Sequence, residues 1–150
     1  WIPPTSSLRS SHQYALDIFF MSGSVRRSGA EETGPKIRSM TRGIVVSASG
    51  DWHGGDRTAN YRSGGLSPKA GNGVIVYNPD TRRYVAYFHL HSVEVRPGSI
   101  VAAGDVIGRG GNTGTNARKR GHGAHVHVEI HDAAGDAWTV YRIRDYIQSM

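Results

Sequence analysis

The sequence predicts a mostly β fold in which antiparallel sheets form a groove flanked by long loops. Short runs of apolar and β-branched residues are separated by Gly, Pro, Asn and Asp. A helical repeat is visible only in the C-terminal VYRIRDYIQSM, for which at most a short helix is expected. The length of 150 residues suits one domain with its own core, so a single domain over 1–150 is predicted.

Six runs are expected to form the strands. They are HQYALDIFF (12–20), GIVVSAS (43–49), NGVIVYN (72–78), RYVAYFHLHSVEV (83–95), SIVAAGDVIG (99–108) and AHVHVEIH (124–131). NPDTRR (78–83) is typical of a turn, because Pro79 presets the backbone and Asn78 and Asp80 can bond it locally. A hairpin is therefore predicted there. Long loops are expected at 21–35, 51–71 and 111–123, where they would form the walls of the groove.

Composition limits the possible partners and cofactors. A net charge of +6 favours an anionic partner, whether nucleic acid, anionic lipid or an acidic cell-wall polymer. No dense row of aromatic residues alternates with the basic ones, so no nucleic-acid partner is expected. The RKR run at 118–120 fits either a solvated loop tip or a grip on an anionic polymer. The absence of Cys excludes disulfides and thiolate metal sites.

The length of the apolar runs and the first residues of the chain lead to two further expectations. No apolar run reaches the length of a transmembrane segment. The chain begins at Trp1 without a recognisable leader, so a fragment or mature form of a longer precursor is expected.

Four of the eight histidines lie in the stretch HGAHVHVEIH (122–131). In an extended strand, three β-branched residues of this stretch share one face and its polar residues share the other: His125, His127, Glu129 and His131. Imidazole is a common metal ligand, and His-x-His on one strand face brings two imidazoles near one point. A metal or catalytic role therefore competes with a merely solvated strand face.

Two other runs offer further donors. In 83–95, simple alternation puts Tyr87, His89 and His91 on one face and the apolar residues Ala86, Phe88 and Leu90, with Tyr84, on the other. The first run offers His12 and Asp17. A carboxylate within the apolar run ALDIFF is costly to bury unless donors or a cation compensate its charge.

Taken in order, these residues resemble a known family. The sequence His12…Asp17, YFHL (87–90), VRPGSIVAAGDVIGRGGNTG (95–114) and HVHVE (125–129) is similar to the lysostaphin-type zinc metallopeptidases, also called LytM-domain peptidoglycan endopeptidases. The resemblance spans nearly the whole chain. It implies one Zn²⁺ per chain, bound by His12, Asp17 and His127, with His89 and His125 lining the water and the substrate.

The resemblance also implies a reaction and a place. The expected activity is hydrolysis of peptide bonds in peptidoglycan stem peptides or crosslinks, with zinc-activated water as the nucleophile. His89 and His125 would serve as general base and oxyanion donor in an order that the sequence leaves open. They should then lie within roughly 10 Å of one another, with His127 beside them. An extracytoplasmic, monomeric enzyme is expected.

The chain departs from the family at its first two ligands. The family spaces them as His-x-x-x-Asp, whereas HQYALD has an offset of five, which in a regular strand would point Asp17 away from the metal. A bulge or bend around Tyr14 or Ala15 is expected to restore its direction. Glu129 would either orient His127 or be solvated. The remaining histidines are expected at the rim or surface: His53, His91, His122 and His131.

A second hypothesis is a catalytically degenerate LytM-like binding or activator module that keeps the fold and loses the metal. Such a module has no physical need to retain the whole set of candidate site residues, which argues against it: His12, Asp17, His89, His125 and His127.

Overall fold

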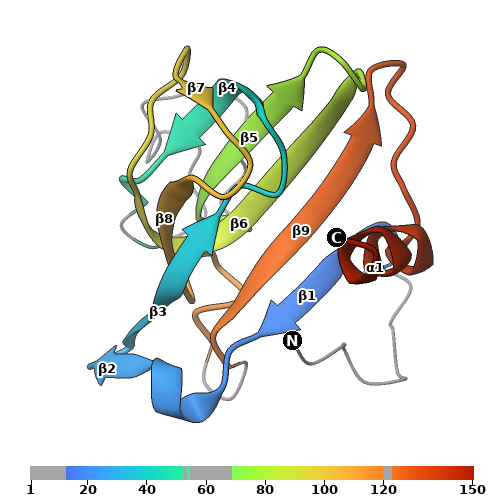
Figure 1. The fold of residues 1–150 in the computed structure, drawn as a ribbon. Helices are drawn as coiled ribbons and strands as arrows, with labels where there is room; N and C mark the ends of the chain where they lie inside the picture. Colours follow the sequence, from blue (N-terminus) through green and yellow to red (C-terminus); the bar gives the residue numbers. More distant parts are fainter. Residues whose placement is uncertain (1–12, 53, 55–68, 120–122) are drawn as a thin grey trace.

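The computed structural model describes residues 13–52, 54, 69–119 and 123–150. These ranges contain nine strands, one 3₁₀ turn and one α-helix (Figure 1). In chain order they are β1 (Leu16–Phe19), η2 (Ser22–Ser24), β2 (Arg26–Ser28), β3 (Glu31–Arg38), β4 (Gly43–Ser49), β5 (Asn72–Asn78), β6 (Arg83–Val93), β7 (Ile100–Val101), β8 (Val106–Gly111), β9 (His125–Asp132) and α1 (Val140–Gln148).

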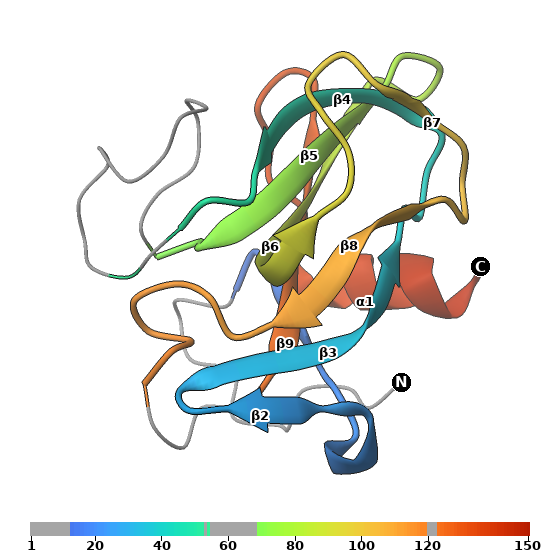
Figure 2. The ribbon, with the colours of Figure 1, turned by 90° about the vertical axis from the view of Figure 1, so that its left-hand side faces the viewer.

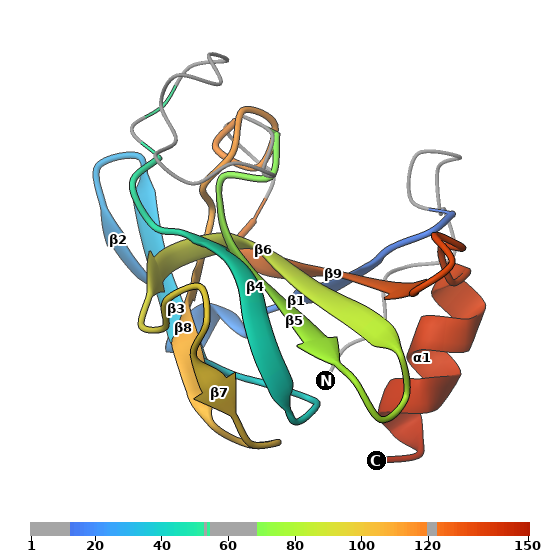
Figure 3. The same cartoon turned by 90° about the horizontal axis from the view of Figure 1, so that it is seen from above.

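The strands pair antiparallel in the order β2-β3-β8-β6-β5-β4-β7, and β9 pairs with both β1 and β6. Figure 2 shows β2, β3 and β8 side by side. Seen from above, the sheet curls so that β3 and β8 stand at an angle to β6 and β9 (Figure 3). Strand β6 lies at this junction, because residues 83–88 pair with β9 and residues 90–93 pair with β8.

Most predicted strands are confirmed. The runs 43–49 and 72–78 are β4 and β5, and residues 79–82 form the turn that leads into β6. The run 99–108 divides into β7 and β8, because a turn closed by Ala102 N–H donating to Asp105 Oδ2 (2.8 Å) interrupts it. The prediction of a loop over 21–35 is wrong in part: β2 and β3 form a hairpin there around Gly29, whose φ of +62° suits a tight turn.

The apolar side of β9 faces the core, as predicted. Val126, Val128 and Ile130 are at most 5% exposed, and Leu16 of β1 packs with them. Helix α1 packs beside β1 and β9 (Figure 1). It contributes Val140 and Ile143 to the core. The prediction of one short C-terminal helix is therefore confirmed.

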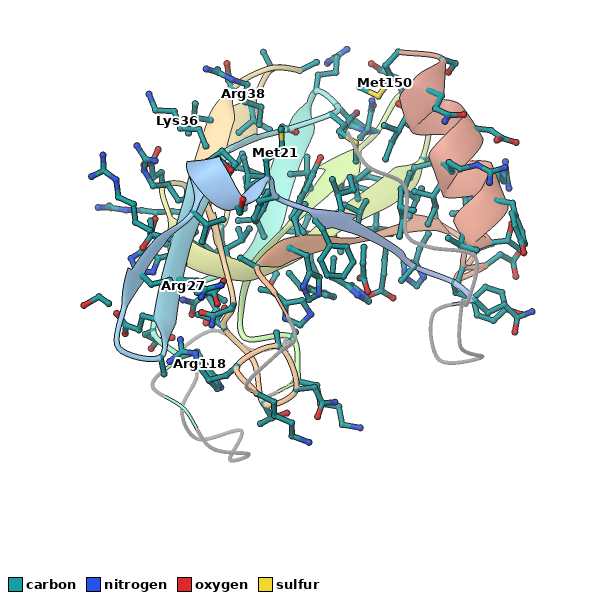
Figure 4. The ribbon with its side chains drawn as sticks, turned by 90° about the horizontal axis from the view of Figure 1, so that it is seen from below. Met21, Arg27, Lys36, Arg38, Arg118 and Met150 are labelled. Carbon is teal, nitrogen blue, oxygen red and sulfur yellow. The ribbon has the colours of Figure 1, made fainter. Side chains whose placement is uncertain are left out.

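Basic side chains are exposed on two neighbouring strands. Arg27, Lys36 and Arg38 lie along β2 and β3 (Figure 4).

Within the described ranges, no helix combines the length and apolar character needed to cross a membrane.

Candidate active site

Asp17 and His127 face each other across β1 and β9. They are direct cross-strand partners, and His127 Nδ1 lies 2.9 Å from Asp17 Oδ1. Their side chains are only 13% and 19% exposed, so a largely buried carboxylate and imidazole form the centre of the cluster. Asp17 points toward the histidines because residues 16 and 18 turn to the core side of the same strand.

Of the bulge or bend expected before Asp17, the structure shows a bend, in the form of a turn. Gln13 and Tyr14 form this turn, and β1 begins only at Leu16. An offset counted from His12 is therefore not an offset along a strand, and the alternation rule does not apply to it. His12 lies outside the described residues, so its part in the site stays a prediction.

Glu129 lies behind His127. Its Oε2 is 3.4 Å from His127 Nε2, and its Oε1 is 3.3 Å from His131 Nε2. Burial alone would lower the pKa of His127, but hydrogen bonds to Asp17 and Glu129 outweigh it and raise the pKa to about 9. Burial also opposes ionisation of Glu129, yet its bonds to the two imidazoles hold its pKa below the usual value. Glu129 is thus positioned to orient His127.

The imidazole of His125 is anchored to the backbone through Nδ1. Its Nδ1 lies 3.0 Å from the carbonyl oxygen of Gly123. A carbonyl only accepts, so Nδ1 carries a proton, and in the neutral ring Nε2 holds the lone pair. That Nε2 lies 3.9 Å from Asp17 Oδ1, and the ring packs against Phe19 at a centroid distance of 4.8 Å.

His89 reaches the cluster through a β-bulge. The register of β5 against β6 shifts here, since Gly73 pairs with Phe88 and Asn72 with Leu90, which leaves His89 as the extra residue. Its φ is +66°, a left-handed conformation that residues with a Cβ seldom adopt and that marks one class of bulge.

The bulge turns the His89 imidazole toward the other two. Its ring centroid lies 4.9 Å from that of His125 and 5.5 Å from that of His127, within the predicted limit. Its Nδ1 lies 2.7 Å from the carbonyl oxygen of Thr113, which fixes the proton on Nδ1. Burial, reinforced by the neighbouring imidazoles, lowers the pKa of His89 to about 3, so this side chain is neutral at pH 7.

The predicted faces of β6 are wrong before the bulge. Tyr87 lies opposite Val128 in the core, 2% exposed, and its hydroxyl accepts a hydrogen bond from Met40 N–H (2.8 Å). Phe88 instead lies opposite His127 and stacks on its ring, with centroids 5.7 Å apart. Simple alternation from Tyr87 to His89 fails because the inserted residue changes which positions face the core.

The described donors fit part of a zinc site. Among the residues that the structure describes, no three His, Asp or Glu side chains form a metal-binding group. Asp17 and His127 nevertheless supply one oxygen and one nitrogen 2.9 Å apart, close to the roughly 3.3 Å that separates two ligands of a tetrahedral zinc ion. A carboxylate behind the imidazole, here Glu129, is also typical of zinc-binding histidines.

The loop after β8 makes two contacts that the alternation of side chains along a strand could not predict. Arg118 folds back, with its guanidinium 5.0 Å from the Trp52 ring centroid and its Nε–H donating to Asn112 O (3.3 Å). Because of these two contacts, the Arg118 side chain is not part of a freely solvated loop tip. Thr113 acts on His89 through its backbone carbonyl, so its side-chain type gives no direct sign of that contact.

Comparisons with known proteins place the chain in a family. The model of peptidase family M23 matches residues 28–139, which include His89, His125 and His127 and begin after Asp17. A search of curated proteins gave no match.

Solved structures share the fold. The catalytic domain of the antimicrobial peptidase lysostaphin from Staphylococcus simulans has a TM-score of 0.59 and 21% identity over 94% of this chain and 85% of that one. LytU has a TM-score of 0.62 and 20% identity, covering 96% and 80% of the two chains. A chain of the SpoIIQ–SpoIIIAH pore forming complex has a TM-score of 0.52 and 19% identity, covering 86% and 83%. Because the family match spans well over half of the sequence, the chain belongs to peptidase family M23.

Proposed function

We propose that this chain is a zinc-dependent endopeptidase that hydrolyses peptide bonds in the stem peptides or crosslinks of bacterial peptidoglycan. The observation that carries this proposal is the convergence of three imidazoles and the Asp17 carboxylate on one face of the sheet in a member of a peptidase family. Buried titratable groups with perturbed pKa values, such as His89 and His127, are typical of functional sites.

Two described residues, Asp17 and His127, would hold the zinc together with His12. When bound, zinc lowers the pKa of water from 15.7 toward about 7 and polarises a carbonyl oxygen. Glu129 accepts from His127 Nε2–H and so turns Nδ1 toward Asp17. This contact favours one ring orientation before any ligand arrives, which reduces the reorganisation needed on binding.

The other two imidazoles are proposed to move the proton. His89 and His125 each donate Nδ1–H to a backbone carbonyl, so each neutral ring has its lone pair on Nε2. One Nε2 would accept the proton of the attacking water, and the protonated ring would then donate to the oxyanion or the leaving amine. The lowered pKa of His89 keeps it available as an acceptor at neutral pH.

The proposed substrate suits the charge of the chain. Peptidoglycan stem peptides carry carboxylates, and a protein with a net charge of +6 attracts them. The proposed place of action is extracytoplasmic, where this polymer lies, and the proposed acting form is a monomer.

The first test combines metal analysis with wall digestion. Purified protein should contain about one zinc per chain, and a chelator should abolish wall hydrolysis until zinc is restored. Mass analysis of fragments from walls of differing crosslink type should show new peptide termini. Full activity in a verified metal-free sample would refute the zinc mechanism, and release of sugar ends alone would refute peptide hydrolysis.

A second candidate is a degenerate LytM-like module that binds the wall or activates a wall hydrolase. It is favoured by the offset of five between His12 and Asp17, which differs from the family's His-x-x-x-Asp spacing, and by the shared fold of a chain from the SpoIIQ–SpoIIIAH pore forming complex. This candidate predicts wall binding without bound zinc and without released peptides. The same two measurements therefore separate it from the first.

A further inference from the structure

A buried polar network lies behind His89, outside the histidine cluster. Its two side chains are Asn72, at the start of β5, and Thr113, in the loop after β8, and they are 3% and 4% exposed. Polar groups this deeply buried require hydrogen-bond partners, and the identity of those partners shows what the network connects.

Asn72 joins three segments of the chain. Its Oδ1 accepts from Trp52 N–H (2.9 Å), beyond the end of β4, and its Nδ2 donates to His91 O (3.1 Å), just past the bulge. Its backbone N–H donates to Thr113 Oγ1 (2.9 Å). Both sides of its amide are therefore used.

Thr113 holds the bulge from two directions. Its hydroxyl donates to Leu90 O (2.6 Å), the residue after His89, while its carbonyl accepts from His89 Nδ1–H (2.7 Å). The backbone N–H of His89 donates to Ala70 O (2.9 Å). Ring and backbone of His89 are thus fixed by neighbouring segments that Asn72 ties together.

The segments around His89 approach at backbone distance. A Cβ on Gly71, whose φ is +65°, would lie 2.4 Å from the carbonyl carbon of Thr113. A Cβ on Gly114, whose φ is +108°, would lie 2.4 Å from Lys69 O and 3.0 Å from His89 Nδ1. Larger residues do not fit here, so the anchor for the imidazole is closely packed.

We propose that Asn72 and Thr113 are positioning residues that hold His89 in its left-handed bulge and direct its Nε2 into the site. The left-handed backbone of His89 is unfavourable for a residue with a Cβ, so contacts around it must maintain it. A misplacement of about 1 Å can lower a rate about a hundredfold. This inference rests on the proposed function, because it affects a rate only if His89 takes part in the reaction.

The chain offers a matched control on the same strand. Asn78 lies at the other end of β5 and is 6% exposed; its Nδ2 donates to Thr41 Oγ1 (2.8 Å) and its Oδ1 accepts from Asp80 N–H (2.9 Å). Asn72→Ala and Asn78→Ala each remove a buried amide that bonds through both of its ends. Melting temperature, zinc content, kcat and KM on a crosslinked wall peptide are to be measured for both.

Both variants should lose a similar amount of stability and retain their zinc. Asn72→Ala should lower kcat about tenfold or more with little change in KM, because His89 loses its orientation. Asn78→Ala should keep kcat per folded molecule. Equal kcat losses in the two variants would show that Asn72 acts only through stability, and the proposal would fail.

A second pair of variants decides the question if Asn72→Ala does not fold. Thr113→Val removes the hydroxyl but keeps the carbonyl that accepts from His89, whereas Thr113→Ser keeps both groups. Thr113→Val should lower kcat, and Thr113→Ser should recover most of the loss. If the serine variant is as slow as the valine variant, the hydroxyl does not position His89.

A measurement without turnover separates this inference from the proposed function. In ¹⁵N-labelled protein, exchange of the His89 Nδ1–H with solvent should be slow, and Asn72→Ala should accelerate it about tenfold while Asn78→Ala should not. An inactive wild type with this exchange pattern would refute the endopeptidase and leave the positioning intact. Unchanged exchange in Asn72→Ala would overturn the positioning whatever the activity.

Discussion

Replacing each member of the His-x-His pair should separate metal binding from proton transfer. In His127, Nδ1 lies 2.9 Å from Asp17 Oδ1 and Nε2 faces Glu129. In His125, Nδ1 is instead anchored to the Gly123 carbonyl. His127→Ala should therefore lose zinc and activity together. His125→Ala should keep most of its zinc and lose activity, because its proposed role is with the water and the substrate.

The expected magnitudes follow from these contacts. His127→Ala leaves at most two of the three proposed ligands. It also removes the imidazole that donates a charge-assisted hydrogen bond to Asp17, and this loss should lower the free energy of unfolding by about 2 kcal/mol. His125→Ala should lower kcat by about a hundredfold, which corresponds to about 2.7 kcal/mol of transition-state stabilisation. The two variants should thus differ in zinc content far more than in activity.

The assay pairs zinc analysis with release of wall peptides, corrected for the folded fraction from urea unfolding. His131→Ala is the control: this side chain is 36% exposed and contacts Glu129 at 3.3 Å, so its loss should leave activity near wild type. Zinc lost from the His125 variant but retained by the His127 variant would refute the assignment. Loss from both would mean that His125 also binds the metal.

Three other perturbations test individual contacts. Glu129→Gln keeps the shape of the side chain but removes its charge from His127 Nε2, and should weaken zinc affinity about tenfold in a competition titration; an unchanged affinity would mean that Glu129 does not support the ligand. His89→Gly should be more stable than His89→Ala by about 1 kcal/mol in urea unfolding, because φ is +66° and only glycine adopts it without strain; the reverse order would argue against the bulge. Burial raises the pKa of Tyr87 to about 12 from 10.0, so the stability it contributes is complete below pH 10 and is lost as pH rises toward 12. The free energy of unfolding should fall by about 3 kcal/mol more over that interval than in Tyr87→Phe, and parallel curves for the two proteins would contradict this.

The strands were predictable where burial on one face makes side chains alternate. Val126, Val128 and Ile130 carry that signal in β9, and the turn residues after Asn78 mark the β5–β6 hairpin. The β2–β3 hairpin was not predictable in this way, because its first strand, 26–28, is exposed along its whole length. Strands of this kind are specified by their turn and their neighbours and not by a buried face.

The candidate site was predictable in its membership more than in its geometry. The order of His and Asp residues pointed to His12, Asp17, His89, His125 and His127, and the structure brings together the four of them that it describes. The distortion expected before Asp17 is present as a turn that precedes β1, although the sequence did not distinguish a bend from a bulge. Hydrogen bonds through backbone carbonyls, such as that of Thr113, depend on tertiary packing and leave little trace in residue types.

The bulge at His89 follows from the position of β6 in the sheet. Up to Phe88 this strand pairs with β9, so Val85 and Tyr87 must face the core opposite Ile130 and Val128. From Leu90 onward it pairs with β8, and Leu90 is again fully buried. Two buried residues three positions apart, Tyr87 and Leu90, cannot share one face of a regular strand, so one extra residue must be accommodated between them. The extra residue is His89, and this distortion turns its imidazole out of the core and toward His125 and His127.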